Sequence, residues 1–314
     1  MQIIHPLQDA SETLQNTAVA IGVFDGVHRG HQEILRQTVR EARSQGLTPL
    51  ALTFDTHPTE LFAPAQSPTY IATLDQRLEL LGEFGGGLEA AAVVRFDAAF
   101  AGLSPEAFVA DVLEAALGAR HVLVGADFCY GTRRSGTVTT LLRDGAKNGF
   151  AVTVVPPILI DGERVSSTQI RGLIAGGDVP AAVGLLGHPF VVRGTVGYGK
   201  QLGRTLGYPT ANLSPAQPKQ LLPGPGVYAT LAHLADGRTV RAAVSVGTNP
   251  TTDTDGVSKV EAFLMDGFAE DLYGQPLALD FRQKVRDTLR FDSLDALVSQ
   301  MARDVDNIAA LIGV

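Results

Sequence analysis

Two histidines three residues apart, His28 and His31, are the residues whose type and spacing most clearly indicate chemistry. They follow an apolar run at 19–24, which predicts a buried strand, and a turn predicted at Asp25-Gly26. We expect a helix to open at His31, where a helix N-terminus would present unpaired N–H groups and the positive end of the helix dipole. The two imidazoles would add donors that point the same way. This arrangement fits an enzyme that binds the phosphates of a nucleotide triphosphate.

The glycines around this pair strengthen the interpretation. A histidine pair alone is weak evidence, because the two rings could equally lie exposed in a turn or bond the backbone. Glycines at 22, 26 and 30, however, would let a phosphate approach the main chain closely. The candidate phosphate-binding residues beside the histidines are therefore Gly22, Phe24, Asp25 and Gly30.

Two further polar positions follow predicted strands. His57 comes after the apolar segment 47–54, and Asp127 lies at the end of the segment 121–128. Ligands of parallel sheets bind beyond the carboxyl ends of the strands, so both side chains are candidate ligands. The alternative for His57 is an ordinary loop, in which Pro58 breaks the strand and Asp55 caps a turn.

A hydroxyl cluster opens another predicted helix. Ser167 and Thr168 begin the segment, and Arg171 follows one turn later. Hydroxyls, a helix N-terminus and a guanidinium would together bind phosphates well. The alternative is a plain N-cap.

The spacing of Gly194, Gly199 and Lys200 resembles the opening of a P-loop. Residue 201 is Gln, where Ser or Thr should bind magnesium, and Leu202-Gly203-Arg204 does not begin a helix. The segment is therefore not a Walker motif. The two glycines and the lysine nevertheless remain candidate ATP-binding residues.

Thr210 and Asn212 lie two residues apart in an extended segment after Pro209, so their side chains would point to the same side. Such oxygen ligands suit Mg²⁺ held jointly with ATP phosphates, although a strand-end turn with an asparagine cap is a real alternative. Glu261 lies in the strand-like segment 260–264. Most carboxylates there face outward, but one on the inner rim of a barrel could deprotonate a hydroxyl.

Strand-like and helix-like segments alternate through the first half of the chain. Nearly continuous apolar strands separated by amphipathic helices predict a parallel sheet covered on both faces. The Ser104-Pro105 pair is a strong helix start, and Gly118 ends that helix. The strands are expected at 17–24, 47–54, 91–96, 121–128 and 150–155, and the helices at 31–45, 73–84 and from 105.

The pattern changes near residue 175, where glycine-rich segments bracket a short helix. Short alternating strands predict an antiparallel barrel or sandwich beyond it. A closing helix from Ser293 carries an apolar stripe that we expect to pack on this domain. The strands are expected at 190–196, 226–233, 239–246, 257–265 and 276–285.

Composition excludes several classes of function. The 314 residues carry 25 basic and 33 acidic side chains, a net charge of −8, so broad capture of nucleic acid or of an anionic membrane is not expected. The single cysteine, Cys129, rules out an internal disulfide framework or a cysteine-rich zinc site. Neither a signal peptide nor a membrane span is evident, so we expect a cytoplasmic protein.

Taken together, these motifs resemble the bacterial bifunctional riboflavin kinase/FMN adenylyltransferase family, also called FAD synthetase. Each motif is modestly specific, but their order along nearly the whole chain is very specific. The matching segments are 22–31, 124–128 with Gly131, 167–171, 203–212, 226–228, 246–251 and 271–274.

The resemblance implies a Rossmann-like nucleotidyltransferase domain at 1–186 and a riboflavin kinase β-barrel with a C-terminal helix at 187–314. The barrel would phosphorylate riboflavin to FMN, and the first domain would adenylylate FMN to FAD, both with ATP and Mg²⁺. By position, His28 and His31 would stabilise the triphosphate, Thr210 and Asn212 would hold Mg²⁺, and Glu261 would be the general base. The residues implied to bind flavin, substrate or pyrophosphate are Asp127, Ser167, Thr168, Arg171, Arg204, Tyr208, Arg286 and Arg290.

Three alternatives stay open at this point. The first is a riboflavin kinase with a weakened or lost adenylyltransferase, since Thr56 and Thr137 stand where the family usually has proline and a carboxylate. Another nucleotidyltransferase with the same histidine motif is the second, but such an enzyme would not carry the segment 209–212 and Glu261. The third is a non-enzymatic flavin-binding regulator. A homo-oligomer is compatible with all of them.

Overall fold

The computed structural model describes residues 1–314 apart from 6, 8–13, 199–206, 248–257, 269 and 313–314. Contacts divide the chain into two compact units. The first comprises Met1–Pro68 and Leu74–Ser166, and the second comprises Thr69–Thr73 and Ser167–Val314. Residues 167–186, which precede the expected boundary at 186 and 187, pack with the second unit. The domain limits at that boundary stay a prediction.

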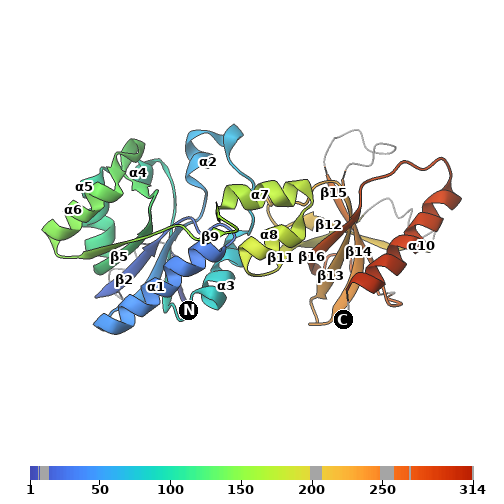
Figure 1. The fold of residues 1–314 in the computed structure, drawn as a ribbon, viewed down its shortest axis with the longest axis horizontal. Helices are drawn as coiled ribbons and strands as arrows, with labels where there is room; N and C mark the ends of the chain where they lie inside the picture. Colours follow the sequence, from blue (N-terminus) through green and yellow to red (C-terminus); the bar gives the residue numbers. More distant parts are fainter. Residues whose placement is uncertain (6, 8–13, 199–206, 248–257, 269, 313–314) are drawn as a thin grey trace. The chain divides into compact units, whose positions relative to one another are not determined.

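A six-stranded sheet in which all neighbours run parallel forms the centre of the first unit (Figure 1). The expected strands are confirmed to within a few residues, and the short edge strand β1 was not predicted. In spatial order the strands are β1 (Gln2–Ile4), β4 (Ala90–Val94), β3 (Thr48–Phe54), β2 (Thr17–Ile21), β5 (Ala119–Gly125) and β8 (Ala151–Val155).

Helices cover both faces of this sheet. Alternate residues of each strand point to opposite sides, and both sets are apolar, so both faces must be buried. Ala20 and Ala51 pack on one face against α1 and α3, whereas Val19 and Leu50 pack on the other against η3 and α6. The helical segments of the first unit are α1 (Arg29–Gln45), α2 (Pro58–Phe62), η2 (Pro64–Gln66), α3 (Leu74–Phe84), α4 (Ala98–Ala101), α5 (Pro105–Ala107), the π-helical η3 (Phe108–Ala116), η4 (Thr132–Arg134) and α6 (Val138–Asn148).

Two small hairpins complete the first unit. They pair β6 (Cys129–Tyr130) with β7 (Gly136–Thr137), and β9 (Leu159–Ile160) with β10 (Glu163–Arg164). The predicted helix start at Ser104 is confirmed, since its hydroxyl accepts a hydrogen bond from the backbone N–H of Ala107.

The second unit contains a closed antiparallel barrel preceded by two helices (Figure 1). The expected barrel is confirmed, and the segment after Pro209 adds a strand, β12, that was expected only to be extended. The elements are α7 (Ser167–Gly176), α8 (Val179–Leu186), β11 (Phe190–Gly197), β12 (Thr210–Pro215), β13 (Gly226–Leu234), β14 (Thr239–Gly247), β15 (Lys259–Leu264), β16 (Pro276–Arg286) and α10 (Leu294–Leu311).

The closing helix α10 packs on the outer face of the barrel, as its apolar stripe predicts. Its residue Ile308 is fully buried against Ala229 and Met265. The stripe is not buried along its whole length, because Leu294 at its start is 57% exposed. Among the described residues no helix is long and apolar enough to cross a membrane.

Candidate active sites

The first candidate site lies at the carboxyl end of β2, where the chain turns into α1. The helix begins at Arg29, two residues earlier than expected, and His28 is its N-cap. The Nδ1 atom of His28 accepts a hydrogen bond from the backbone N–H of His31 at 3.4 Å. Because Nδ1 is the acceptor, the proton of the neutral imidazole lies on Nε2, which can donate to an anion.

The two imidazoles lie nearly parallel and stacked. Their ring centroids are 3.6 Å apart at an interplanar angle of 18°, and the Phe24 ring meets His31 edge-on at 5.3 Å. The neighbouring glycines make room for these rings rather than only for a ligand. A Cβ on Gly22 would lie 2.9 Å from the Phe24 ring, and one on Gly30 would lie 3.1 Å from His28 Cε1.

The predicted turn at Asp25-Gly26 is confirmed. The Val27 N–H donates to the Phe24 carbonyl at 3.0 Å, and Gly26 has a φ of 74°. Phe24 and Val27 also have positive φ values, 53° and 35°, although both are fully buried. Such a backbone is strained for side chains of this size, so the surrounding packing must impose it.

A buried arginine that sequence analysis missed holds the loops beside this turn. Arg77 of α3 is 1% exposed and donates to the carbonyls of Val23 at 2.8 Å and Phe54 at 2.5 Å. Val23 lies two residues beyond β2 and Phe54 is the last residue of β3, so one guanidinium joins the carboxyl ends of two neighbouring strands. Position 77 looked like an ordinary charged residue of an amphipathic helix, and no local pattern distinguishes it.

His57 lies beyond the end of β3, as expected, and is the N-cap of α2. Its Nδ1 accepts from the N–H of Thr59 at 3.2 Å. The Asp55 carboxylate accepts from the backbone of Thr56 at 2.7 Å and of Phe96 at 2.9 Å, so it joins the ends of β3 and β4. Both loops are therefore held at the same edge of the sheet.

Asp127 lies two residues beyond β5 and is paired with Arg164 of β10, whose Nη2 is 2.8 Å from Oδ2. Both side chains are more than half exposed. Thr137, where a carboxylate is usual in the family, is the N-cap of α6 and forms a reciprocal capping box with Thr140. The threonine thus supplies the cap that a carboxylate would also supply.

A cluster of aromatic rings at this edge of the sheet was also missed. Phe62 of α2 is 66% exposed and its ring lies 6.2 Å from that of Phe96, which contacts Phe54 and Phe100 at 5.5 and 5.7 Å. Sequence analysis placed Phe54 and Phe96 at the ends of predicted strands and assigned no role to Phe62 or Phe100. The sequence feature that could have pointed to a ligand-binding role is their position at the carboxyl ends of strands, since Phe54 ends β3 and Phe96 closely follows β4.

In the second unit, the hydroxyl cluster opens a helix as predicted. Ser167 is the first residue of α7, and Thr168 is exposed beside it. Arg171 lies one turn along, and its Nε donates to the carbonyl of Thr69 at 2.7 Å. The geometry of this terminus therefore agrees with both the anion-binding and the capping interpretations.

The candidate residues of the barrel form one row across neighbouring strands. Glu261 of β15 is in register with Asn212 of β12 on one side and with Ser245 of β14 on the other. Thr210 lies two residues from Asn212 and so on the same face. Directly opposed side chains have Cβ atoms about 4.5–5.5 Å apart, so the carboxylate and the amide are close neighbours.

This row lies on the outer face of the barrel. The sequence analysis had linked a base role of Glu261 to the inner rim, and that placement is wrong. The neighbours Val260 and Ala262 are 2% and 0% exposed and fill the interior, whereas Glu261 is half-buried on the opposite face. Ser245 is the row residue that sequence analysis missed. Only the pairing of β14 with β15, which is not visible from local sequence, reveals it.

Other barrel candidates have structural partners. Tyr208 meets the ring of Phe263 at 5.1 Å, and a Cβ on Gly194 would lie 2.1 Å from the carbonyl oxygen of Ser214. The missing side chain at Gly194 is thus required by the approach of β11 and β12. Three candidates, Gly199, Lys200 and Arg204, lie outside the described residues.

Arg286 is engaged with α10. Its Nη2 lies 2.7 Å from Oδ2 of Asp304, a residue only 3% exposed, and its Nη1 donates to the Asp287 carbonyl at 2.9 Å. This pair fastens the end of β16 to the closing helix. Arg290, the other arginine candidate for flavin binding, is exposed.

Two family models match this chain, one in each half of the sequence. Residues 10–169 match the family model described as FAD synthetase, and residues 186–312 match the model described as riboflavin kinase. A solved structure of a protein named a macrolide-efflux protein, from Streptococcus pneumoniae, has a TM-score of 0.83 and 30% identity, and 99% of each chain is covered.

Curated relatives match over nearly their full length. A bifunctional riboflavin kinase/FMN adenylyltransferase of Escherichia coli (strain K12) is 37% identical, covering 97% of this chain and 96% of its own. Proteins of the same name from Listeria monocytogenes and Bacillus subtilis are 34% and 31% identical, covering 98% and 97% of this chain and 96% and 95% of their own.

Proposed function

Because the chain belongs to the bifunctional riboflavin kinase/FMN adenylyltransferase family, and so makes FMN and then FAD, we propose that two separate sets of side chains carry the two reactions. Riboflavin, FMN and ATP are the substrates that the family implies. The observation that carries the proposal is the register of Glu261 with Asn212, which puts a carboxylate beside two neutral oxygen donors.

In the kinase reaction, Glu261 is the proposed general base. A carboxylate within hydrogen-bond reach of the ribityl 5′-hydroxyl would take its proton as the oxygen attacks the γ-phosphorus of ATP. ADP then leaves with the electron pair of the broken bond. The half-buried position of Glu261 supports this role, since part of the residue is accessible to solvent.

The same row fits a bound Mg²⁺. Thr210 and Asn212 offer a hydroxyl and an amide oxygen on one face of β12, and magnesium prefers such hard oxygen ligands. When bound, the ion would neutralise charge on the ATP phosphates. Thr210 and Asn212 orient the nucleotide, and Glu261 holds the proton that leaves the hydroxyl.

In the adenylyl-transfer reaction, a phosphate oxygen of FMN attacks the α-phosphorus of ATP, and pyrophosphate leaves. The N–H groups at the start of α1 and the Nε2–H of His28 are proposed to stabilise the charge that builds on the phosphates. His31 and His57 are the proposed additional donors. Ser167, Thr168 and Arg171 are proposed to bind the leaving pyrophosphate, since their types suit an anion.

The exposed aromatic side chain Phe62 supports flavin binding by the first unit. An apolar ring that is 66% exposed beside Phe96 gives a flat flavin system a surface on which to stack. Flavin binding there would cover Phe62, which would account for a large apolar side chain on a solvent-exposed surface.

The test is to incubate the protein with riboflavin, ATP and Mg²⁺ and to separate the products by chromatography. We expect FMN to form first and FAD to follow. FMN alone would favour a kinase with a lost adenylyltransferase, and no conversion would favour a flavin-binding regulator. A parallel incubation with excess chelator should stop both reactions if the proposed Mg²⁺ dependence is correct.

A further inference from the structure

The row of paired residues that holds Glu261 continues across the barrel beyond Ser245. Ser245 of β14 is in register with Val227 of β13, and Val227 is in register with Arg286 of β16. The register of β13 and β16 shifts beside Val227, but the bond from Arg286 to Asp304 of the outer helix α10 agrees that Arg286 lies on the outer face. From β12 to β16 the row therefore consists of Asn212, Glu261, Ser245, Val227 and Arg286.

The row is open to solvent at Ser245, directly beside the proposed base. Ser245 is exposed, and its hydroxyl has no hydrogen-bond partner among the described residues. The next outward-facing residues of β13 and β14, Ala229 and Ala243, pack instead in the apolar cluster around Ile308 of α10. A hydroxyl beside the carboxylate is therefore accessible to a ligand, at the edge of the area that α10 covers.

The proposed chemistry gives this row a direction. Thr210 and Asn212, which are proposed to hold Mg²⁺ and the nucleotide, lie on β12, to one side of Glu261. In phosphoryl transfer the attacking oxygen and the leaving group lie roughly in line, on opposite sides of the transferred phosphorus. An acceptor that brings its hydroxyl to Glu261 therefore extends away from β12 and over β14. Ser245 is the first side chain of the row that it meets there.

We propose that Ser245 binds the acceptor of the kinase reaction, its hydroxyl bonding the ribityl 4′-hydroxyl while Glu261 takes the proton of the neighbouring 5′-hydroxyl. Direct cross-strand partners have Cβ atoms about 4.5–5.5 Å apart, so the two side chains can reach adjacent hydroxyls of one chain. A serine hydroxyl both donates and accepts, which suits a polyol. Ser245 thus selects acceptors that carry a hydroxyl beside the reacting one. This inference rests on the proposed role of Glu261 as the base.

The test measures KM and kcat for the phosphorylation of riboflavin and of 4′-deoxyriboflavin, which lacks only the hydroxyl in question. Ser245→Ala removes the serine hydroxyl, whereas Ser245→Thr keeps a hydroxyl on a side chain that suits a strand. The matched control is Ser214→Ala. Ser214 is also exposed and lies on the same face of β12 as Asn212, but it is in register with Thr195 and not with Glu261.

We expect Ser245→Ala to raise the KM for riboflavin about two- to tenfold, as for the loss of one hydrogen bond between neutral groups. The KM for 4′-deoxyriboflavin should be the same in Ser245→Ala and in the parent, because the analogue already lacks the partner of the serine. The KM for ATP should stay at the parental value, which also reports that the barrel is folded. Ser245→Thr and Ser214→Ala should keep the parental KM for riboflavin.

Three results would overturn the proposal. An unchanged KM for riboflavin in Ser245→Ala would show that the serine does not contact the acceptor. An equal rise in KM for both flavins would show that the 4′-hydroxyl is not its partner. A lower kcat with a shifted pH profile and an unchanged KM would show that Ser245 acts on the Glu261 carboxylate instead.

Glu261→Ala separates this inference from the role on which it rests. If Glu261→Ala phosphorylates riboflavin at the parental rate, Glu261 is not the base and the proposed direction of the row loses its foundation. If Glu261→Ala makes no FMN while Ser245→Ala leaves the KM for riboflavin unchanged, the base is assigned correctly and only the contact between Ser245 and the acceptor is wrong.

Discussion

Glu261 of β15 and Asn212 of β12 are direct cross-strand partners on the outer face of the barrel, with Thr210 two residues along the same face. Their alternation with Val260 and Ala262, which fill the interior, fixes the face on which each side chain lies. A shift of the register by one residue would move Glu261 into the apolar core. The pairing of these two strands is therefore what brings a carboxylate to the oxygen donors proposed to hold the metal and nucleotide.

Replacing Glu261 tests the base directly. Glu261→Ala should abolish the formation of FMN from riboflavin, by about 10²–10⁴-fold in kcat, because the proposed general base is removed. Formation of FAD from supplied FMN should continue at the parental rate. Chromatography of the products from each substrate measures both activities.

The matched control for Glu261 is Glu270→Gln. Glu270 is an exposed carboxylate of the same unit, paired with Arg238 at 2.7 Å. Its removal should leave both activities unchanged, since exposed ion pairs contribute little. Loss of both activities in Glu261→Ala, or of neither, would show that the two reactions do not use separate residues as proposed.

His31→Ala should have the reverse effect. The loss of one imidazole donor should slow adenylyl transfer by about 10²–10³-fold and leave phosphorylation of riboflavin intact. His5→Ala, which removes an exposed histidine of the same unit, is the control. Parental FAD formation by His31→Ala would mean that the histidine pair does not stabilise the triphosphate.

The strands of the parallel sheet could be predicted from sequence because each is a continuous apolar run, as in Thr17–Ile21, where every residue is buried. β12 was not predicted as a strand, since Thr210–Pro215 mixes polar and apolar residues and only one of its six residues is buried. The edge strand Gln2–Ile4 was missed because three residues give no periodicity.

The placement of candidate site residues was predictable where local sequence fixes it, as at His28, where a strand, a turn and a helix follow one another. The placement of the other residues depends on contacts between segments that are far apart in the sequence. Ser245 meets Glu261 only through the pairing of β14 with β15, and Arg77 meets Val23 across 54 residues. The bond between the Arg286 guanidinium and Asp304 likewise joins residues eighteen apart, and the proposed flavin-binding role of Arg286 stays a prediction.

Arg77 gives a third prediction, which concerns stability. Arg77→Met keeps the apolar stem but leaves the carbonyls of Val23 and Phe54 without its two hydrogen bonds. We expect unfolding to require about 2–4 kcal/mol less free energy, as for buried polar groups that lose a charged partner. Urea unfolding measures this, and Arg40→Met, which changes an exposed arginine of α1, should shift the midpoint little.

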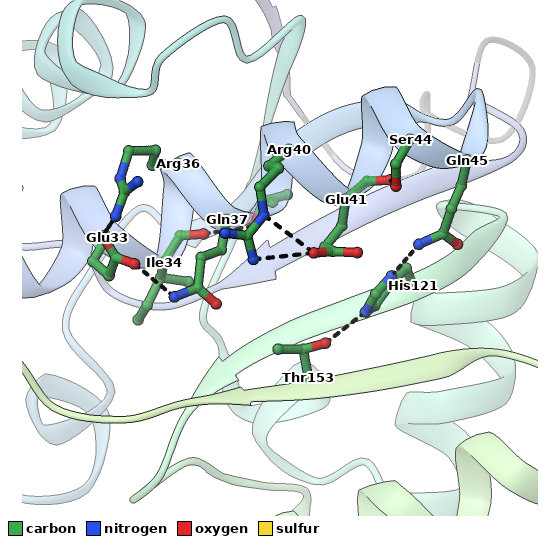
Figure 2. Close-up of polar contacts among 11 residues, drawn as sticks. Glu33, Ile34, Arg36, Gln37, Arg40, Glu41, Ser44, Gln45, His121 and Thr153 are labelled. Atoms are coloured by element: carbon green, nitrogen blue, oxygen red, sulfur yellow. Dashed lines mark hydrogen bonds and ion pairs between the residues drawn. The ribbon is translucent and has the colours of Figure 1, made fainter.

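The last prediction concerns pH and the far end of α1 (Figure 2). Gln45, the final residue of the helix, contacts Nδ1 of His121 at 2.9 Å, and Nε2 contacts the Thr153 hydroxyl at 2.8 Å. The amide nitrogen can only donate, so Nδ1 accepts and the neutral ring carries its proton on Nε2. A second proton would set two donors against each other.

Burial is the main cause that lowers the pKa of His121 below its ordinary value of 6.5, and the charge of Glu41 opposes this in part. The unfolded chain then binds the proton more readily than the folded one. The stabilisation is complete above about pH 6.5 and is lost as pH falls from there to the lowered pKa of the folded state, by up to about 1.4 kcal/mol per pH unit.

His121→Gln removes this titration while keeping a polar side chain. We expect the parent to lose stability between pH 7.5 and 5.5 more steeply than the variant, as measured by urea midpoints at each pH. Equal slopes for the two proteins would show that the folded ring is protonated as easily as the unfolded one. The contact of Gln45 with His121, drawn in Figure 2, would then tolerate the imidazolium, contrary to the donor and acceptor roles inferred above.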